Sequence, residues 1–291
     1  MTTQQKPLLP TWARIILFII SFLFLSFLFI GVGTLVLNIS VDETSDLVAS
    51  SKVFMQIMQL FTLLALAIVV YVFRKYIDRK SIMSLGFSIK NRAADLGMGL
   101  FIALLVMGGG SLVLLVLGVA GFSFSGFDFG ALGMSFLLFI VVALTEEIMV
   151  RGYILNNLLS VLNRYVALII SAAIFMAMHG LNSGLSVVAF INLFLAGIFL
   201  GSTYIFTQNL WFPVSLHLFW NFLQGPVFGY KVSGHTTESL FSLNLSGNDL
   251  LTGGDFGFEG SLVCTVLSVV AIAIILFSCS RKNRLPADIS L

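Results

Sequence analysis

Residues 132–159 read LGMSFLLFIVVALTEEIMVRGYILNNLL. This stretch is long and apolar enough to cross a bilayer, because a membrane helix needs about 20 mostly apolar residues. It nevertheless contains two adjacent acids, Glu146 and Glu147, and one base, Arg151. Ionisable side chains are costly inside a membrane and usually serve a function there. The stretch therefore predicts a transmembrane helix whose ionisable side chains have a function.

The rest of the chain is equally apolar. Of its 291 residues, 58% are hydrophobic and only 10% are charged, whereas a soluble domain carries about 25% charged residues. Seven further apolar runs lie at 12–37, 53–73, 96–120, 166–178, 185–206, 211–228 and 261–279. This pattern predicts an all-α fold, a polytopic membrane helix bundle of about eight transmembrane helices. It excludes a soluble protein, and the chain is too apolar for a secreted disulfide scaffold.

The distribution of Lys and Arg predicts the orientation of this bundle. With a cytoplasmic N-terminus and eight alternating helices, 13 of the 15 basic residues fall on the cytoplasmic side, and only Lys52 and Lys231 lie opposite. Cytoplasmic loops carry the excess of basic residues in membrane proteins. Both termini are therefore predicted to be cytoplasmic, in a multi-pass protein of a bacterial plasma membrane. No basic and aromatic patch indicates nucleic-acid binding.

The runs divide the chain into three predicted parts. Residues 1–131 hold about three membrane helices and a basic cytoplasmic loop, and residues 132–228 hold a core of about four helices. Residues 229–291 hold a Gly- and Ser-rich exterior loop, a final membrane helix and a basic cytoplasmic tail. Within the core, GIFLG at 197–201 pairs two glycines four residues apart, which is typical of closely packed membrane helices.

Helical spacing separates the roles of the two glutamates. Glu147 and Arg151 are four residues apart with the acid first, the favourable order for an ion pair on a helix. Adjacent helical residues diverge by about 100°, so Glu146 points elsewhere. We expect Glu147 to support the structure through Arg151, and Glu146 to face the bundle interior as a general base.

Two histidines in other apolar runs extend the candidate site. Phe175 precedes His179 by one turn, and His217 precedes Asn221 by one turn. An imidazole and a carboxamide aligned in this way can donate two hydrogen bonds to one oxygen, as an oxyanion hole requires. The third histidine, His235, lies in the Gly- and Ser-rich loop and is interpreted as a solvated loop residue.

Each of these features also has a structural interpretation. A Glu–Arg pair can simply stabilise a helix, and a lone His or Asn in a membrane helix can hydrogen-bond a neighbouring helix. The conjunction favours a catalytic site, because an acid pair, His179 and the pair of His217 and Asn221 lie on three separate helices. Few other buried charges are expected in the chain.

The motifs of these three helices, in their order along the chain, resemble those of a known family. Glu-Glu-x-x-x-Arg at residues 146–151, Phe-x-x-x-His at 175–179 and His-x-x-x-Asn at 217–221 are similar to the motifs of the CPBP family. This family comprises type II CAAX prenyl endopeptidases and proteins of the abortive-infection type. SLGF at 84–87 resembles a short segment upstream in these proteins. The specific part of the likeness covers about residues 132–228.

The resemblance implies an intramembrane endopeptidase with a helical catalytic core. In the family's usual mechanism the residues matching Glu146 and His179 activate a water, and those matching His217 and Asn221 stabilise the oxyanion. Glu147 matches the second acid of the motif, which together with the arginine is expected to support the structure. The implied substrate is a peptide or a membrane protein, possibly prenylated, that reaches the enzyme at the lipid bilayer.

Metal dependence is an open alternative. Glu146, His179 and His217 together could form a zinc site, since two histidines and a glutamate are a common catalytic zinc set. The chain lacks His-Glu-x-x-His, the usual signature of membrane zinc proteases. A zinc mechanism also leaves Asn221 without a role. We therefore expect no metal and no other cofactor.

Two non-proteolytic functions compete with the endopeptidase. A membrane scaffold or immunity-type binding protein could keep the fold without catalysis, but degraded motifs would then be expected, and these are intact. A transporter could use Glu146 as a proton carrier. That reading predicts pseudo-symmetric halves or broken helices, and the sequence shows no internal repeat.

Overall fold

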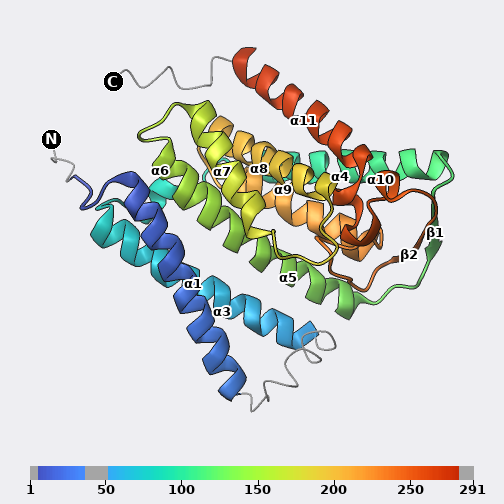
Figure 1. Ribbon diagram of the computed structural model, residues 1–291, viewed down its shortest axis with the longest axis horizontal. Helices are drawn as coiled ribbons and strands as arrows, with labels where there is room; N and C mark the ends of the chain where they lie inside the picture. Colours follow the sequence, from blue (N-terminus) through green and yellow to red (C-terminus); the bar gives the residue numbers. More distant parts are fainter. Residues whose placement is uncertain (1–5, 37–51, 282–291) are drawn as a thin grey trace.

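A computed structural model of the protein describes residues 6–36 and 52–281 and is mostly helical (Figure 1). The elements in chain order are α1 (Thr11–Val36), α3 (Lys52–Val72), the π-helix η1 (Phe73–Ile77), the 3-10 helix η2 (Ile82–Leu85), α4 (Ala93–Val116), β1 (Ala120–Phe124), α5 (Phe129–Glu147), the π-helix η3 (Ile148–Leu155), α6 (Asn156–Leu158), α7 (Arg164–Met178), α8 (Val187–Thr207), α9 (Trp211–Phe222), the π-helix η4 (Leu223–Val227), β2 (Phe241–Leu245), α10 (Asp249–Thr252), the 3-10 helices η5 (Gly254–Phe256) and η6 (Phe258–Gly260), and α11 (Leu262–Arg281).

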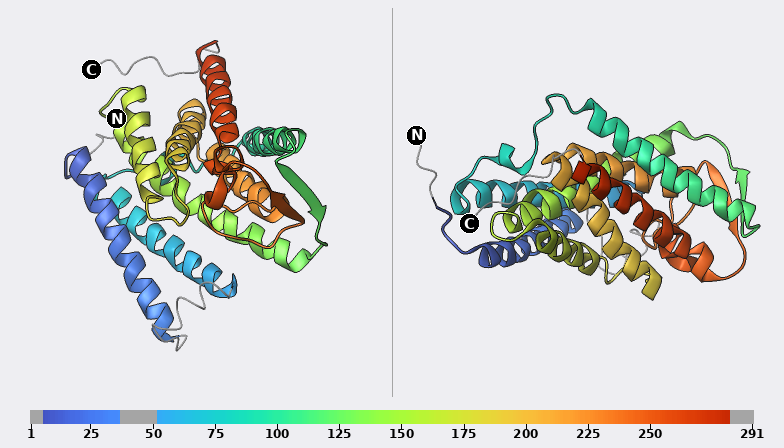
Figure 2. Two further views of the ribbon diagram at one scale, coloured as in Figure 1. Left: turned by 45° about the vertical axis from the view of Figure 1, so that its right-hand side comes forward. Right: turned by 90° about the horizontal axis from the view of Figure 1, so that it is seen from above.

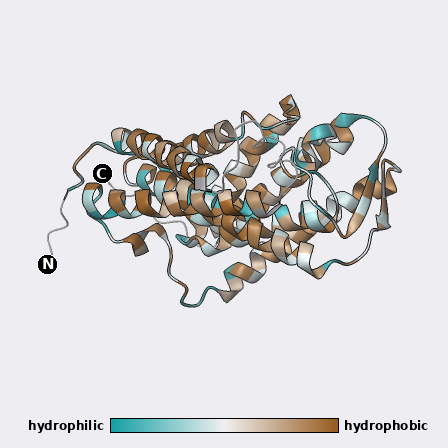
Figure 3. Ribbon diagram, turned by 90° about the horizontal axis from the view of Figure 1, so that it is seen from below, coloured by the Kyte–Doolittle hydropathy of each residue, from teal (hydrophilic) through white to brown (hydrophobic). Residues whose placement is uncertain are grey.

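Each apolar run of the sequence contains a helix, and five of these helices, within the described residues, are long and apolar enough to cross a membrane. Helices α7 and α11 are apolar but shorter. Hydrophobic residues predominate along the helices, as Figure 3 shows. Many of their large apolar side chains are exposed on the outer helix surfaces. Phe27 on α1, for example, is 79% exposed. Such a surface suits lipid, so the fold is that of a helical integral membrane protein.

The helices form a hairpin and a bundle. Helices α1 and α3 pair with each other, and α3 also packs on α5 (Figure 1). In the bundle, α9 packs against α4, α5 and α8, while α7 packs on α8. Helix α11 lies on α8 and α4, as the turned views show (Figure 2). Helix α9 thus lies among three other helices, and its polar side chains become part of the interior. The predicted division at residues 131 and 228 stays a prediction.

Two details correct the purely helical prediction. Strands β1 and β2 form a two-stranded antiparallel sheet with Ala120 opposite Leu245. Ala120, expected at the end of the third membrane helix, therefore lies in a strand, because α4 ends at Val116 and Gly118 adopts a left-handed φ of 70°. The loop at 229–260 is also structured, since it contains β2, α10, η5 and η6.

Local polar residues begin the helices that flank the site. The side chain of Asp128 accepts a hydrogen bond from the N–H of Ala131 at the start of α5. Asn163 and Ser186 do the same at the starts of α7 and α8. Each side chain satisfies a backbone donor that the first helical turn leaves unpaired. The helix starts are thus encoded locally in the sequence.

The paired glycines at 197–201 allow α7 and α8 to approach closely, as expected. A Cβ at Gly197 would lie 2.7 Å from Cα of Ala172, and one at Gly201 would lie 2.4 Å from Leu168. Both distances are shorter than a Cβ tolerates, so only glycine fits at this helix contact without a shift. The close approach also places the carbonyl of Gly197 within reach of Arg151 on η3, at 3.2 Å.

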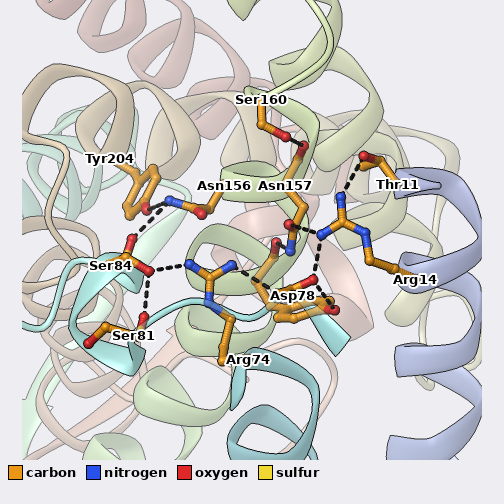
Figure 4. Close-up of polar contacts among 11 residues, drawn as sticks. Thr11, Arg14, Arg74, Asp78, Ser81, Ser84, Asn156, Asn157, Ser160 and Tyr204 are labelled. Carbon is orange, nitrogen blue, oxygen red and sulfur yellow. Dashed lines mark hydrogen bonds and ion pairs between the residues drawn. The ribbon is translucent and has the colours of Figure 1, made fainter. Parts of the chain in front are cut away.

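A buried cluster of charged and polar side chains joins the ends of several helices at one face (Figure 4). Asp78 forms ion pairs with both Arg14 and Arg74. Asn157 accepts a second hydrogen bond from Arg14, and Ser84 accepts one from Arg74. Both arginines are among the basic residues predicted to lie on the cytoplasmic side, yet both are buried. They can be buried because both guanidinium groups pair with the same carboxylate and donate further hydrogen bonds to neighbouring side chains.

Candidate active site

Four residues predicted from the sequence line one cavity. Glu146, His179, His217 and Asn221 come from α5, the end of α7 and α9, and they share a cavity of about 360 Å³. Apolar side chains of α3, α5, α7 and α8 form much of the wall. A largely apolar cavity with a few convergent polar groups is the usual form of a ligand site.

The carboxylate of Glu146 faces both imidazoles. Its Oε2 lies 3.7 Å from Nε2 of His179 and 3.9 Å from Nε2 of His217. These separations exceed a direct hydrogen bond. An oxygen atom beside the three groups can hydrogen-bond to the carboxylate and to an imidazole at the same time. The same Oε2 is buried and has no hydrogen-bond partner within the protein. The geometry therefore suits an oxygen of water or substrate held between the three groups.

A backbone carbonyl orients His179. The residue follows the last turn of α7, and its Nδ1 lies 2.9 Å from the carbonyl oxygen of Phe175. A carbonyl only accepts hydrogen bonds, so Nδ1 carries the proton. In the neutral ring Nε2 then has a free lone pair, which faces Glu146. His179 can accept a hydrogen bond from water at that nitrogen. The ring of Phe175 packs against the imidazole at a tilt of 46°.

Glu147 has a contact that sequence reasoning misses. The expected ion pair with Arg151 is present at 2.7 Å, and both side chains are fully buried. The same Oε1 of Glu147 also lies 2.9 Å from Nδ1 of His217, 70 residues further along the chain. Helical spacing predicts the first contact but contains no signal for the second. Glu147 therefore contacts the imidazole of the candidate site as well as the arginine.

The contact constrains the protonation of His217. The Nδ1 nitrogen donates to the carboxylate of Glu147, so a neutral ring leaves Nε2 as an acceptor. Donation from Nε2 to a substrate oxygen requires the doubly protonated ring. The buried carboxylate at 2.9 Å stabilises that charged form. Asn221 lies one turn further along α9, is 6% exposed and lines the same cavity.

The turn after Glu147 is wound as a π-helix. Residues 148–155 form η3, directly after the last α-helical residue of α5. Such turns are frequent at functional sites. Here Arg151 contacts three groups, the carboxylate of Glu147, the carbonyl of Gly197 and the ring of Phe175, whose centroid lies 4.4 Å from the guanidinium carbon.

Glu259 is a cavity residue from the predicted Gly- and Ser-rich exterior loop. It lies on η6, lines the cavity, and accepts hydrogen bonds from Nε1 of Trp220 at 3.0 Å and from the hydroxyl of Ser233 at 2.9 Å. No local motif marks it, because all three residues are distant in sequence. His235 also lines the cavity, and it is exposed, in agreement with a solvated loop position.

The site contains side chains of the types that bind metal ions. Glu146, His179 and His217 are zinc ligands by type. Across residues 6–36 and 52–281, however, no group of three or more His, Cys, Asp and Glu side chains has an arrangement suited to a metal ion. That the site needs no metal stays a prediction.

A family model matches the segment that builds this cavity. Residues 128–223, about a third of the chain, match the family described as type II CAAX prenyl endopeptidase Rce1-like. The resemblance read from the motifs is thereby confirmed over this segment, which includes Glu146, His179, His217 and Asn221. At the level of the family, the match indicates a CAAX-type intramembrane protease, which is a hydrolase. No curated protein matches the chain.

Proposed function

We propose that this protein is an intramembrane endopeptidase that hydrolyses peptide bonds with a glutamate-activated water. The observation that carries the proposal is the convergence of two Nε2 atoms, from His179 and His217, on one carboxylate oxygen of Glu146. The groups come from three helices and share one cavity with Asn221. This set provides both functions that amide hydrolysis needs, a base for water and donors for the oxyanion.

In the first step Glu146 removes a proton from a water. The water hydrogen-bonds to Oε2 of Glu146 and to the free Nε2 of His179, two atoms that lie 3.7 Å apart. Its oxygen attacks the carbonyl carbon of the scissile bond, and the π electrons of the carbonyl move onto its oxygen. Glu146 is now a neutral carboxylic acid. The adjacent apolar wall excludes bulk water, which strengthens these interactions.

The negative oxygen of the tetrahedral intermediate requires donors. We assign Nε2–H of His217, in its charged form, and Nδ2–H of Asn221 to this role. Glu147 is a positioning residue, since it holds Nδ1 of His217 and is itself held by Arg151. When the C–N bond breaks, Glu146 returns its proton to the leaving amine. Water is thus consumed, and the carboxylate is regenerated.

A purified-enzyme assay tests this proposal. Wild type and Glu146→Gln are compared on fluorogenic peptides with and without a farnesylated cysteine near the C-terminus, and each reaction is repeated with a metal chelator. Asp95→Asn is the matched control, because its carboxylate pairs with Arg92 outside the cavity. We expect cleavage by wild type and the control, none by Glu146→Gln, and no effect of the chelator. Full activity of Glu146→Gln would refute the assignment, and loss on chelation would favour zinc.

The two peptide types in this assay also distinguish prenylated from unprenylated substrates. Prenyl dependence is expected only if the apolar wall binds the lipid chain, and equal cleavage of both peptides would show that a prenyl group is not needed. A scaffold predicts no Glu146-dependent cleavage of any substrate. In that case a crosslinker introduced at the cavity would trap an intact partner in the membrane, whereas the proposed enzyme would release two products.

A further inference from the structure

The two ends of the bundle differ in charge. We call the end with the Arg14, Arg74 and Asp78 cluster the basic face, and the opposite end, with β1, β2 and residues 229–261, the acidic face. The described basic-face residues are Lys6, Arg14, Arg74, Lys75, Arg79, Lys80, Lys90, Arg92 and Arg164, with only Asp78 and Asp95 as acids. The acidic face has Asp128, Glu238, Asp249, Asp255 and Glu259, and its described bases are Lys52 at the start of α3 and Lys231.

Contacts define these faces independently of charge. At the basic face, hydrogen bonds join the start of α1, the end of η1, α6 and the end of α8 (Figure 4). At the acidic face, β1 pairs with β2, and the turn between α7 and α8 is joined to the long loop through Asn182 and the carbonyl of Ser233, at 3.2 Å. The helices run between these two sets of contacts.

The catalytic cavity reaches the acidic face. Its polar rim is formed by Asn182 and by loop residues that include Ser233, His235 and Thr236, all from acidic-face connections. Both His235 and Thr236 are exposed. His179 itself follows the last turn of α7 at this end of the helix. The cavity is therefore continuous with the acidic end of the molecule.

Packed side chains close the cavity toward the basic face. Glu147 and Arg151 follow Glu146 in the direction of the basic face and form a fully buried ion pair. Tyr153 comes next, and its side chain is fully buried. The ring of Tyr153 stacks on Phe18 of α1 at 3.8 Å. The arginine cluster lies beyond these residues. No basic-face residue named above lines the cavity.

We infer that the scissile bond of the substrate reaches this site from the non-cytoplasmic side of the membrane. The inference rests on the proposed function and on the rule that basic ends of membrane proteins stay in the cytoplasm. With the basic face inside, the rim at Thr236 lies outside. The substrate is then a peptide segment exposed at the outer surface, and a prenylated terminus of a cytoplasmic protein lies on the wrong side.

Cysteine labelling tests which side the rim faces. Thr236→Cys places a thiol at the exposed rim, and Ser88→Cys places one at an exposed position of the basic face. The unmodified protein is the background control for its two native cysteines. With a membrane-impermeant maleimide on intact cells, we expect Thr236→Cys to react and Ser88→Cys to react only after permeabilisation. The reverse pattern would overturn the inference, whatever the enzyme's activity.

A substrate pair tests the same inference by cleavage. One peptide sequence cleaved by the purified enzyme is fused to a single membrane helix in either orientation, so that it lies outside or inside. Wild type is expected to cut only the outside version, and Glu146→Gln neither. Cleavage of the inside version alone would overturn the inference and leave the endopeptidase intact. Loss of Glu146 dependence with Thr236→Cys still labelled outside would refute the proposed function and leave the orientation intact.

Discussion

Asp78 is the residue whose replacement should weaken the fold most clearly. Its carboxylate is fully buried and forms ion pairs with two buried guanidinium groups, those of Arg14 and Arg74. Asp78→Asn keeps the shape of the side chain and removes the charge. Two buried cations are then left without a counter-charge. Removal of one partner from a buried ion pair costs about 3–5 kcal/mol, and we expect the upper end of this range.

Thermal unfolding in detergent, followed by tryptophan fluorescence, measures the effect. In a chain of this size about 5 kcal/mol corresponds to a decrease in Tm of roughly 10–20 °C. Asp95→Asn is the matched control, because its pair with Arg92 at 2.9 Å is partly exposed and such pairs contribute about 1 kcal/mol or less. If Asp78→Asn lowers Tm no more than Asp95→Asn does, the cluster does not stabilise the fold and the reasoning is wrong.

Three further predictions concern the site and the helix contact. Asn221→Ala should lower kcat by about 100- to 1,000-fold, the usual effect of losing one oxyanion donor, with KM little changed; an unchanged kcat would remove Asn221 from the mechanism. Glu147→Gln should lower both Tm and kcat, because one carboxylate serves both a buried arginine and an imidazole; a fall in Tm alone would restrict it to a structural role. Gly197→Ala should destabilise the protein by about 1–3 kcal/mol, whereas Gly97→Ala, whose new Cβ meets nothing within 4 Å, should not; equal Tm values would contradict the close contact with Ala172.

Local sequence determined much of the fold. A membrane helix is encoded by a run of apolar residues, because each helix satisfies its own backbone hydrogen bonds in lipid. The helices therefore begin and end within a few residues of the runs read from the sequence. The pair of Glu147 and Arg151 was equally predictable, since side chains four residues apart meet on any helix. The ordered motifs indicated the family over the segment that its model matches.

Tertiary structure alone decided which helices meet. The contact of Glu147 with His217 joins positions 70 residues apart, and no periodicity in either helix encodes it. The same holds for Glu259 beside Trp220 and for Asp78 between its two arginines. Sequence patterns report the preferences of one helix for lipid or protein. The partners of a buried polar group depend on how whole helices pack, because only packing brings distant groups within hydrogen-bond reach. Those hydrogen bonds offset the free-energy cost of burying the polar groups.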